Sequence, residues 1–213
     1  TAEVLHEIYL KCLAAFFGDA LDDQEWYRNT WARIPHFYGS PYYVFQYATS
    51  KAAAVLIHRR MTEGDGEERT ATVEAYLELL GQTITRVLRG SGRLRQSVAD
   101  SSYDAWTKFY KQDANAANSI VSYYAKGSLV ALVTDLKLRV ETGGKMSLDD
   151  VMKAAWQRWG ETGEGMPEQG FESLCVDMAG FDIRDFLDAA VRGTGELPLE
   201  ALLHAHGIEL HMR

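Results

Sequence analysis

Apolar residues recur at helical spacing in several stretches of the chain, and polar or glycine-rich segments separate these stretches. The first stripe follows Thr1, a plausible N-cap, and ends before Gly18. Its apolar members are Val4, Leu5, Ile8, Cys12, Leu13 and Phe16. Because a spacing of three or four residues places side chains on one helical face, this pattern predicts a first helix of about four turns.

The same reasoning predicts further helices along the rest of the chain. Pro35 should end the helix expected at 22–32, since the residue before a proline is pushed out of the α region. The expected ranges are 22–32, 41–62, 73–88, 101–110, 119–141, 147–160, 168–179, 182–192 and 198–206. The string IELHM at 208–212 could form a frayed strand. With no alternating strand series and no fixed repeat, the predicted class is all-α, a multi-helix bundle of about eight to ten helices.

The composition is that of a globular protein rather than a disordered chain or a coiled coil. The 213 residues are 46% hydrophobic and 24% charged, and their formal net charge is -8. An acidic balance argues against binding to nucleic acid or to an anionic membrane surface, because both need a basic excess. The longest apolar run, 129–133, is far below the roughly 20 residues of a membrane span. We expect neither nucleic acid nor membrane as a partner.

The two cysteines indicate a reducing compartment. Cys12 and Cys175 lie far apart in the sequence, which is not the pattern of a disulfide framework. We expect both to be free thiols packed in the core of a cytoplasmic protein, since reactive thiolates need an electropositive and partly exposed setting. The chain shows no signal peptide, and its first residue is Thr1 rather than Met, which suggests a fragment of something longer.

An aromatic string near the N-terminus carries a first family resemblance. The string WARIPHFYGSPYYVFQYATSKAAA at 31–54 resembles the C-terminal helical end of oligoendopeptidase F-type zinc peptidases, and the likeness covers residues 1 to about 75. In that family the segment lies across the cleft from the zinc and contacts substrate and the developing oxyanion. The resemblance implies a transition-state role for His36 and substrate contacts for Tyr43 and Tyr47. Ser50 stands where the family usually has glycine.

The remainder of the chain resembles a second family. The strings GRLRQSVADSSYDAWTKFY at 92–110, SYYAKGSLVALVTDLKLR at 122–139 and RGTGELPLEALLHAHGIEL at 192–210 are similar to the helical part of the glycyl aminopeptidases, zinc enzymes of the gluzincin type. This resemblance implies that Tyr124 is the tyrosine that hydrogen-bonds the tetrahedral intermediate. Both resemblances imply a fold like the C-terminal helical subdomain of zinc metallopeptidases.

The two resemblances meet near YLELL at 76–80, inside a predicted helix. We therefore expect an oligoendopeptidase F-like segment at 1–80 and a glycyl aminopeptidase-like segment at 81–213, which could share one core. The chain could be two halves of one family, or a natural or engineered chimera. The absence of a linker favours the chimera.

The zinc motif of both families is missing from this sequence. Their metal lies on an H-E-x-x-H helix, where two histidines one turn apart bind zinc and the glutamate is the general base. The only His-Glu pair here is His6-Glu7, and Leu10 takes the place of the second histidine. In both families the zinc helix lies upstream of the segments present here. We expect no metal or other cofactor on this chain.

Three histidines near the C-terminus are the alternative ligand set, namely His204, His206 and His211. The first two are separated by one residue on a predicted helix, so their side chains diverge by about 200°. Such histidines more often face solvent than a metal. The sequence therefore favours no zinc site there.

These observations leave three functional hypotheses. The first is a non-catalytic helical protein, inactive in isolation; the second is a peptidase subunit whose metal site is on another chain; the third is a weak peptide-binding module. Because the upstream half of each family is missing, apolar surface should be uncovered, and homo-oligomers would bury it. We expect four aromatic residues to fill a helix-helix interface, although they could instead line a peptide pocket: Phe37, Tyr43, Phe45 and Tyr47.

Overall fold

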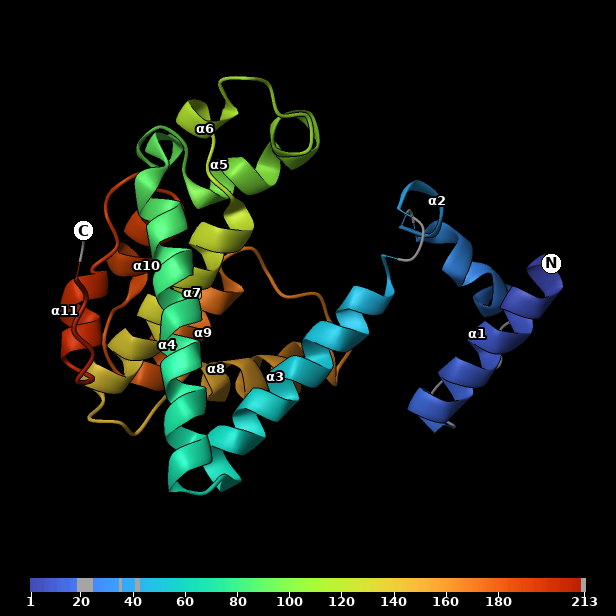
Figure 1. The fold of residues 1–213 in the computed structure, drawn as a ribbon, viewed down its shortest axis with the longest axis horizontal. Coiled ribbons are helices and arrows are strands. Elements are labelled where there is room, and N and C mark those ends of the chain that lie inside the picture. The colour runs from blue at the N-terminus through green and yellow to red at the C-terminus, as the bar shows by residue number, and fades with distance from the viewer. Residues whose placement is uncertain (19–24, 35, 41–42, 212–213) are drawn as a thin grey trace. The chain divides into compact units, whose positions relative to one another are not determined.

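The computed structural model describes residues 1–18, 25–34, 36–40 and 43–211 (Figure 1). Over these ranges the chain forms helices, turns and irregular segments, with no strand, which confirms the all-α prediction. The expected strand at IELHM is wrong for its described part, because residues 208–211 have no regular secondary structure. Internal contacts divide the chain into two units, Thr1–Tyr76 and Leu77–Arg213. The family boundary near residue 80 stays a prediction.

The first unit begins with two helical segments that pack together. Helix α1 spans Ala2–Phe17, with Thr1 at its N-cap and Gly18 at its C-cap with a φ of 54°, as predicted. The second expected helix is a 3-10 helix at Glu25–Arg33, and it packs against α1. An ion pair of 3.0 Å joins Arg28 to Glu3 across this contact. The expected start of that helix at 22–24 lies outside the described residues.

Three more helices follow, α2 at His36–Gly39, α3 at Phe45–Glu63 and α4 at Gly66–Arg89. Helix α4 begins earlier than its apolar stripe because the Asp65 side chain accepts a hydrogen bond of 2.9 Å from the backbone N–H of Glu68, which caps the first turn. Helix α4 continues without a break through 76–80 and into the second unit.

No described residue of the first unit is buried. The apolar side chains of α3 are among the most exposed, with Phe45 at 61%. Cys12 is exposed too, so the prediction that it packs in a core is wrong. The spacing of apolar residues predicted these helices, but Val4, Leu5 and Ile8 of α1 stay exposed, as do Val55 and Leu56 of α3.

The second unit packs around α7, which spans Tyr123–Glu141 (Figure 1). Its other α-helices are α5 at Val98–Tyr103, α6 at Ala116–Ser119, α8 at Leu148–Ala155, α9 at Gly170–Ala179, α10 at Arg184–Val191 and α11 at Leu199–His204. Ser91–Leu94 is a 3-10 helix, and Ala105–Phe109 and Trp156–Gly160 are single π-helical turns. The predicted helices at 101–110, 119–141 and 147–160 are therefore each divided into two.

Two buried clusters form the core of this unit, and α7 contributes to both. Leu129 and Val133 pack with residues of α4 and α11, whereas Leu138 packs with residues of α8, α9 and α10. Cys175 belongs to the second cluster and is fully buried, which confirms its predicted core role. Burial raises the pKa of its thiol to about 11, so this cysteine stays protonated near neutral pH.

Capping boxes start α5 and α8. The hydroxyl of Ser147 and the carboxylate of Asp150 cap the first turn of α8 reciprocally. Ser97 and Asp100 make the same arrangement at α5. The hydrogen bonds from the serine hydroxyl and backbone N–H lower the pKa of each aspartate, because they stabilise the charged carboxylate.

Candidate functional site

The segment 120–122 determines where α7 begins, and two buried side chains fix it in place. Gln96 accepts a hydrogen bond of 3.1 Å from the backbone N–H of Val121, and Ser101 donates from its hydroxyl to the Val121 carbonyl. Ser122 then caps α7 by accepting a hydrogen bond of 3.2 Å from the N–H of Ala125. The predicted helix at 119–141 is interrupted because these contacts hold Val121 outside the helix.

This start places Tyr123 and Tyr124 in the first turn of α7, beside Tyr110. The hydroxyl of Tyr110 lies 2.9 Å from the hydroxyl of Tyr123 and 2.9 Å from that of Tyr124. The rings of Tyr123 and Tyr124 are 4.2 Å apart between centroids. Three phenol oxygens therefore gather at one end of the helix. Tyr124, the residue that the sequence selected, is 60% exposed.

The hydrogen bonds among these phenols separate their acidities. The hydroxyl of Tyr110, and after it that of Tyr123, lowers the pKa of Tyr124, because both can stabilise its phenolate. The pKa of Tyr123 is raised by its hydrogen bonds to Tyr110 and Tyr124. Of these two tyrosines, Tyr124 therefore loses its proton more readily, and its neutral hydroxyl is the stronger hydrogen-bond donor.

A buried lysine follows the tyrosines in the sequence. Lys126 is only 2% exposed, and its ammonium lies 3.5 Å from the carbonyl oxygen of Arg93. Burial lowers its pKa, while the charge of Glu196 partly opposes this shift. Glu196 itself forms an ion pair of 2.7 Å with Arg93. These contacts attach the first turn of α7 to the 3-10 helix at 91–94.

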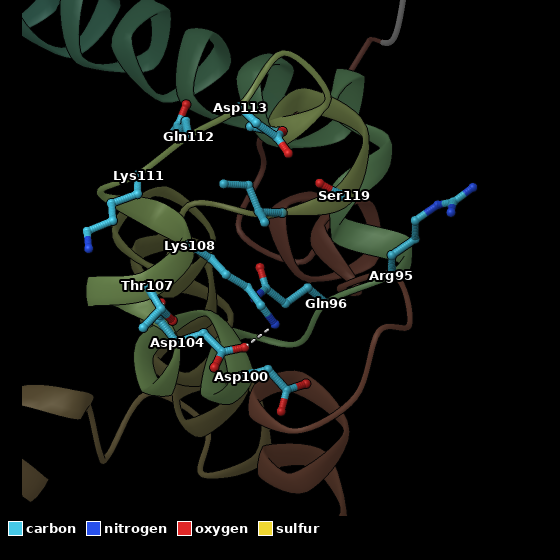
Figure 2. A pocket seen from close by; sticks show the side chains of 12 residues that line it. Arg95, Gln96, Asp100, Asp104, Thr107, Lys108, Lys111, Gln112, Asp113 and Ser119 are labelled. Atoms are coloured by element: carbon cyan, nitrogen blue, oxygen red, sulfur yellow. Dashed lines mark hydrogen bonds and ion pairs between the residues drawn. The ribbon is translucent and has the colours of Figure 1, made fainter.

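A polar cavity of about 550 Å³ lies beside the segment that carries Tyr110 (Figure 2). Asp104 and Lys108 form an ion pair with each other inside it, and Figure 2 shows that Arg95 extends away from the other labelled side chains. Positive and negative side chains both line the cavity, so its charge favours neither a cation nor an anion.

In the first unit, the structure brings together the other three predicted site residues. His36 stacks on Tyr43 with 5.1 Å between ring centroids, and the hydroxyl of Tyr47 lies 3.5 Å from Nε2 of His36. Tyr43 and Tyr47 meet edge to face at 5.7 Å. These three side chains belong to the first unit, whereas Tyr124 belongs to the second.

The expectation that the neighbouring aromatic residues fill a helix-helix interface is wrong. Phe37, Tyr43, Phe45 and Tyr47 are all exposed. Phe37 meets Trp31 of the 3-10 helix at 6.3 Å between ring centroids, and Tyr43 meets Tyr47 edge to face. The stretch therefore presents an aromatic surface.

Sequence reasoning missed Tyr110 and Tyr123 as members of the site. Tyr123 was adjacent to the selected tyrosine and could have been noticed as half of a Tyr-Tyr pair. Tyr110 lies 14 positions before Tyr124. The polar loop between them gave no indication that the chain returns to the same place.

The described residues do not fit a zinc ion. Over those ranges no group of three or more His, Cys, Asp or Glu side chains is placed to hold a metal. Nδ1 of His204 lies 2.8 Å from a carboxylate oxygen of Glu209, and Nδ1 of His206 lies 2.8 Å from the carbonyl of Leu202, so these histidines have separate partners. Among the described helices, none is both long and apolar enough to cross a membrane.

Comparison with known proteins gives two groups of relatives. The profile of the M61 glycyl aminopeptidase family matches residues 67–130, which include all three clustered tyrosines. In the N-terminal region the chain is 41% identical over 80 residues to the group B oligopeptidase PepB of Streptococcus agalactiae, and 42% identical over 78 residues to an oligoendopeptidase F homolog of Borreliella burgdorferi. These alignments cover 38% and 37% of this chain and 12% of each relative.

A solved structure extends the second similarity. The crystal structure of an aminopeptidase N family protein from Idiomarina loihiensis matches 70% of this chain and 24% of its own chain, with 43% sequence identity and a TM-score of 0.61. The chain therefore spans a small part of the length of its relatives. It is similar to two groups of zinc peptidases, the oligoendopeptidases F in its N-terminal region and the M61 glycyl aminopeptidases over residues 67–130.

Proposed function

We propose that this chain forms the helical, transition-state side of a zinc peptidase site and has no peptidase turnover by itself. The observation that carries the proposal is the position of Tyr124. Tyr124 is an exposed residue at the start of α7, its pKa is lowered by neighbouring phenols, and it falls within the stretch that is similar to the glycyl aminopeptidases.

The chemistry that Tyr124 offers is stabilisation of an oxyanion. Attack on a peptide carbonyl moves negative charge onto its oxygen, and a fixed donor aimed at that oxygen lowers the barrier. A phenol with a lowered pKa is suited to this role because its proton is shared more readily with an anionic oxygen. In the first unit, the similarity to the oligoendopeptidases F supports a separate assignment, a transition-state role for His36 and peptide contacts for Tyr43 and Tyr47.

The zinc ligands and the general base would then come from another chain that carries H-E-x-x-H. What supports this assignment is the sequence itself, because His6-Glu7 is followed by Leu10 rather than by the second histidine that the motif requires. A metal-bearing partner would complete the site, and this chain would supply the phenol.

Mixing the chain with such a partner tests this proposal. The partner is the H-E-x-x-H part of an M61 glycyl aminopeptidase, prepared without its helical region; the mixture is called the assembled peptidase. With zinc present, we expect hydrolysis of glycyl p-nitroanilide by the assembled peptidase and none by either component alone.

Two outcomes would contradict the proposal. Turnover by the chain alone, retained after removal of trace contaminants, would show that it is a complete enzyme. A stable complex with the partner, detected by size-exclusion chromatography but without hydrolysis, would show that the helical units do not complete the site.

The origin of the chain as a chimera is part of the same proposal. It is supported by the two similarities, which belong to different peptidase groups, and by the unbroken course of α4 through 76–80. The segments 1–80 and 81–213 would then derive from separate parents joined inside this helix.

A cytoplasmic setting is proposed from the two unpaired cysteines, and cell fractionation checks it.

We also propose that the chain self-associates through the apolar face of α3. Side chains such as Phe45, Val55 and Leu56 are exposed there, and contact between copies would remove them from water. Light scattering after size-exclusion chromatography should give about twice the chain mass of 23.9 kDa. Val55→Lys should shift the mass toward the monomer, whereas Lys51→Gln on the same helix should not. A monomeric mass at every concentration would contradict self-association.

A further inference from the structure

We propose that a cavity beside the start of α7 binds the C-terminal carboxylate of a short peptide whose last side chain is apolar. The cavity has a volume of about 310 Å³, and we call it the arginine cavity because Arg86 and Arg93 line it. All of its walls belong to the second unit. The peptidase role proposed above does not require this site, and the site can be tested on the chain alone.

The arginine cavity lies in a basic part of an acidic protein. The segment 79–99 contains four arginines and no acidic residue, whereas the whole chain has a formal net charge of -8. Among the residues that the structure describes, no aspartate or glutamate lines the cavity. Because the low-dielectric walls of a cavity focus the field of the charges beside it, this cavity attracts anions although the protein as a whole repels them.

The two arginines of the cavity have different surroundings. Arg93 donates from Nη2 to a carboxylate oxygen of Glu196 at 2.7 Å and from Nη1 to the carbonyl of Gly90 at 3.0 Å. Glu196 therefore offsets the charge of Arg93 and holds its side chain in place. The side chain of Arg86 is exposed and has no hydrogen bond or ion pair with any residue in the described ranges. One uncompensated positive charge remains at the cavity.

This balance of charge matches one carboxylate. A guanidinium presents its N–H groups as a planar fork, which pairs with the two oxygens of a carboxylate in a bidentate arrangement. A carboxylate carries one negative charge, and Arg86 offers the one positive charge that lacks a partner. The charged end of the ligand therefore lies at Arg86.

The rest of the cavity wall is largely apolar. It includes Val87 at the end of α4, the ring of Phe109, and three residues of the segment before α7, namely Ala116, Ile120 and Val121. An apolar group placed against such a wall leaves water, which is favourable, whereas a bare inorganic anion gains nothing there. A volume of about 310 Å³ is at the lower end of the range for ligand pockets, so it suits a ligand of about one residue.

Two polar side chains favour a peptide end over a free carboxylic acid. Ser122 and Gln112 also line the cavity. The hydroxyl of Ser122 accepts a hydrogen bond of 3.2 Å from the N–H of Ala125, and its own proton has no acceptor among the described residues. This proton can therefore bind the carbonyl of an amide. The side-chain amide of Gln112 can both donate and accept. The last peptide bond of a ligand thus has partners beside its carboxylate.

Titration of the chain with small ligands tests this site, with backbone amide NMR shifts as the readout. N-acetyl-leucine carries the carboxylate, the apolar side chain and the amide, and it should shift the amides of 116–125 in a saturable manner. N-acetyl-leucinamide differs only in the charge, and we expect it to bind about tenfold more weakly or worse. Two further probes each lack one feature: 4-methylpentanoate has no amide and inorganic phosphate has no apolar group. Both should bind more weakly than N-acetyl-leucine.

A substitution on α4 locates the site, and a neighbouring one is its control. Arg86→Gln should weaken N-acetyl-leucine about tenfold, to the affinity of N-acetyl-leucinamide. Arg89→Gln removes the same charge from an exposed position three residues further along α4, but Arg89 does not line the cavity. This control should leave the affinity nearly unchanged.

Four results would overturn the proposal. N-acetyl-leucine and N-acetyl-leucinamide could bind equally well, or Arg86→Gln and Arg89→Gln could have the same effect. Phosphate as tight as N-acetyl-leucine would indicate a bare anion site, and 4-methylpentanoate as tight would indicate a free carboxylic acid as the ligand. The comparison of ligands needs no substitution, so it decides the matter even if a variant does not fold. Because no turnover is measured, a failure here is distinguishable from a failure of the assembled peptidase.

Discussion

In the assembled peptidase, Tyr124→Phe should lower kcat by about 10²- to 10³-fold and leave KM nearly unchanged, which is the usual cost of losing one oxyanion donor. The substitution removes a single hydroxyl, and the ring contacts with Tyr123 and Phe109 are kept. The lost interaction is made to an oxygen whose charge develops only in the transition state. The loss therefore appears in kcat rather than in substrate binding.

Steady-state kinetics with glycyl p-nitroanilide measures this effect, with Tyr103→Phe as the matched control. Tyr103 is a tyrosine on the neighbouring helix α5, and its hydroxyl lies outside the cluster of phenols. The control should retain full kcat. A Tyr124→Phe protein with unchanged kcat, or with a change confined to KM, would show that Tyr124 does not act on the oxyanion.

Gly92→Ala should destabilise the second unit by about 4 kcal/mol or more, which places it among the most damaging single substitutions. Gly92 is buried, and a Cβ atom there would overlap the carbonyl oxygen of Ile120 and lie 2.8 Å from its backbone nitrogen. Backbone atoms cannot move aside as the end of a flexible side chain can. Relief would require the segment 120–122 to shift, and that segment carries the contacts that place Tyr123 and Tyr124.

Two glycines in helices provide controls for this substitution. A Cβ atom at Gly81 in α4 would meet nothing within 4 Å, and one at Gly127 in α7 would lie 3.8 Å from a methyl group of Val98. Gly81→Ala should therefore stabilise the protein by about 0.5 to 1 kcal/mol, since alanine is the better helix former, and Gly127→Ala should not destabilise it. Urea denaturation followed by circular dichroism measures all three. A loss below about 1 kcal/mol for Gly92→Ala would contradict the close packing against Ile120.

The sequence identified only one member of the tyrosine cluster in the candidate site. Tyr124 could be selected because it belongs to a short string that resembles the glycyl aminopeptidases. Tyr110 could not, because its partners lie 13 and 14 positions away, beyond a polar loop. The loop returns to the start of α7 because Gly92, Gln96 and Ser101 hold the segment 120–122. Each of these contacts is tertiary and leaves no periodic pattern.

For apolar residues too, the sequence predicted the helices but not which side chains are buried. Spacing alone identified the apolar stripe of α1 and the apolar character of α3, but it also predicted that Cys12 and Phe45 would be buried, and both are exposed. Cys175 was assigned to the core by the same reasoning and is there. Periodicity reports which side chains share a face of a helix, but it does not report whether another element covers that face.

By itself, the sequence determined the all-α class, several of the helix ends and the similarity to two groups of zinc peptidases. Local interactions are sufficient for the helical class and the helix ends, because caps such as Ser147 and the C-terminal Gly18 act within one turn of their own residues. Only the tertiary structure decided the break before α7, the burial of Lys126 and the meeting of the three tyrosines. Each of these depends on contacts between residues distant in sequence, and such contacts form only when the whole unit packs.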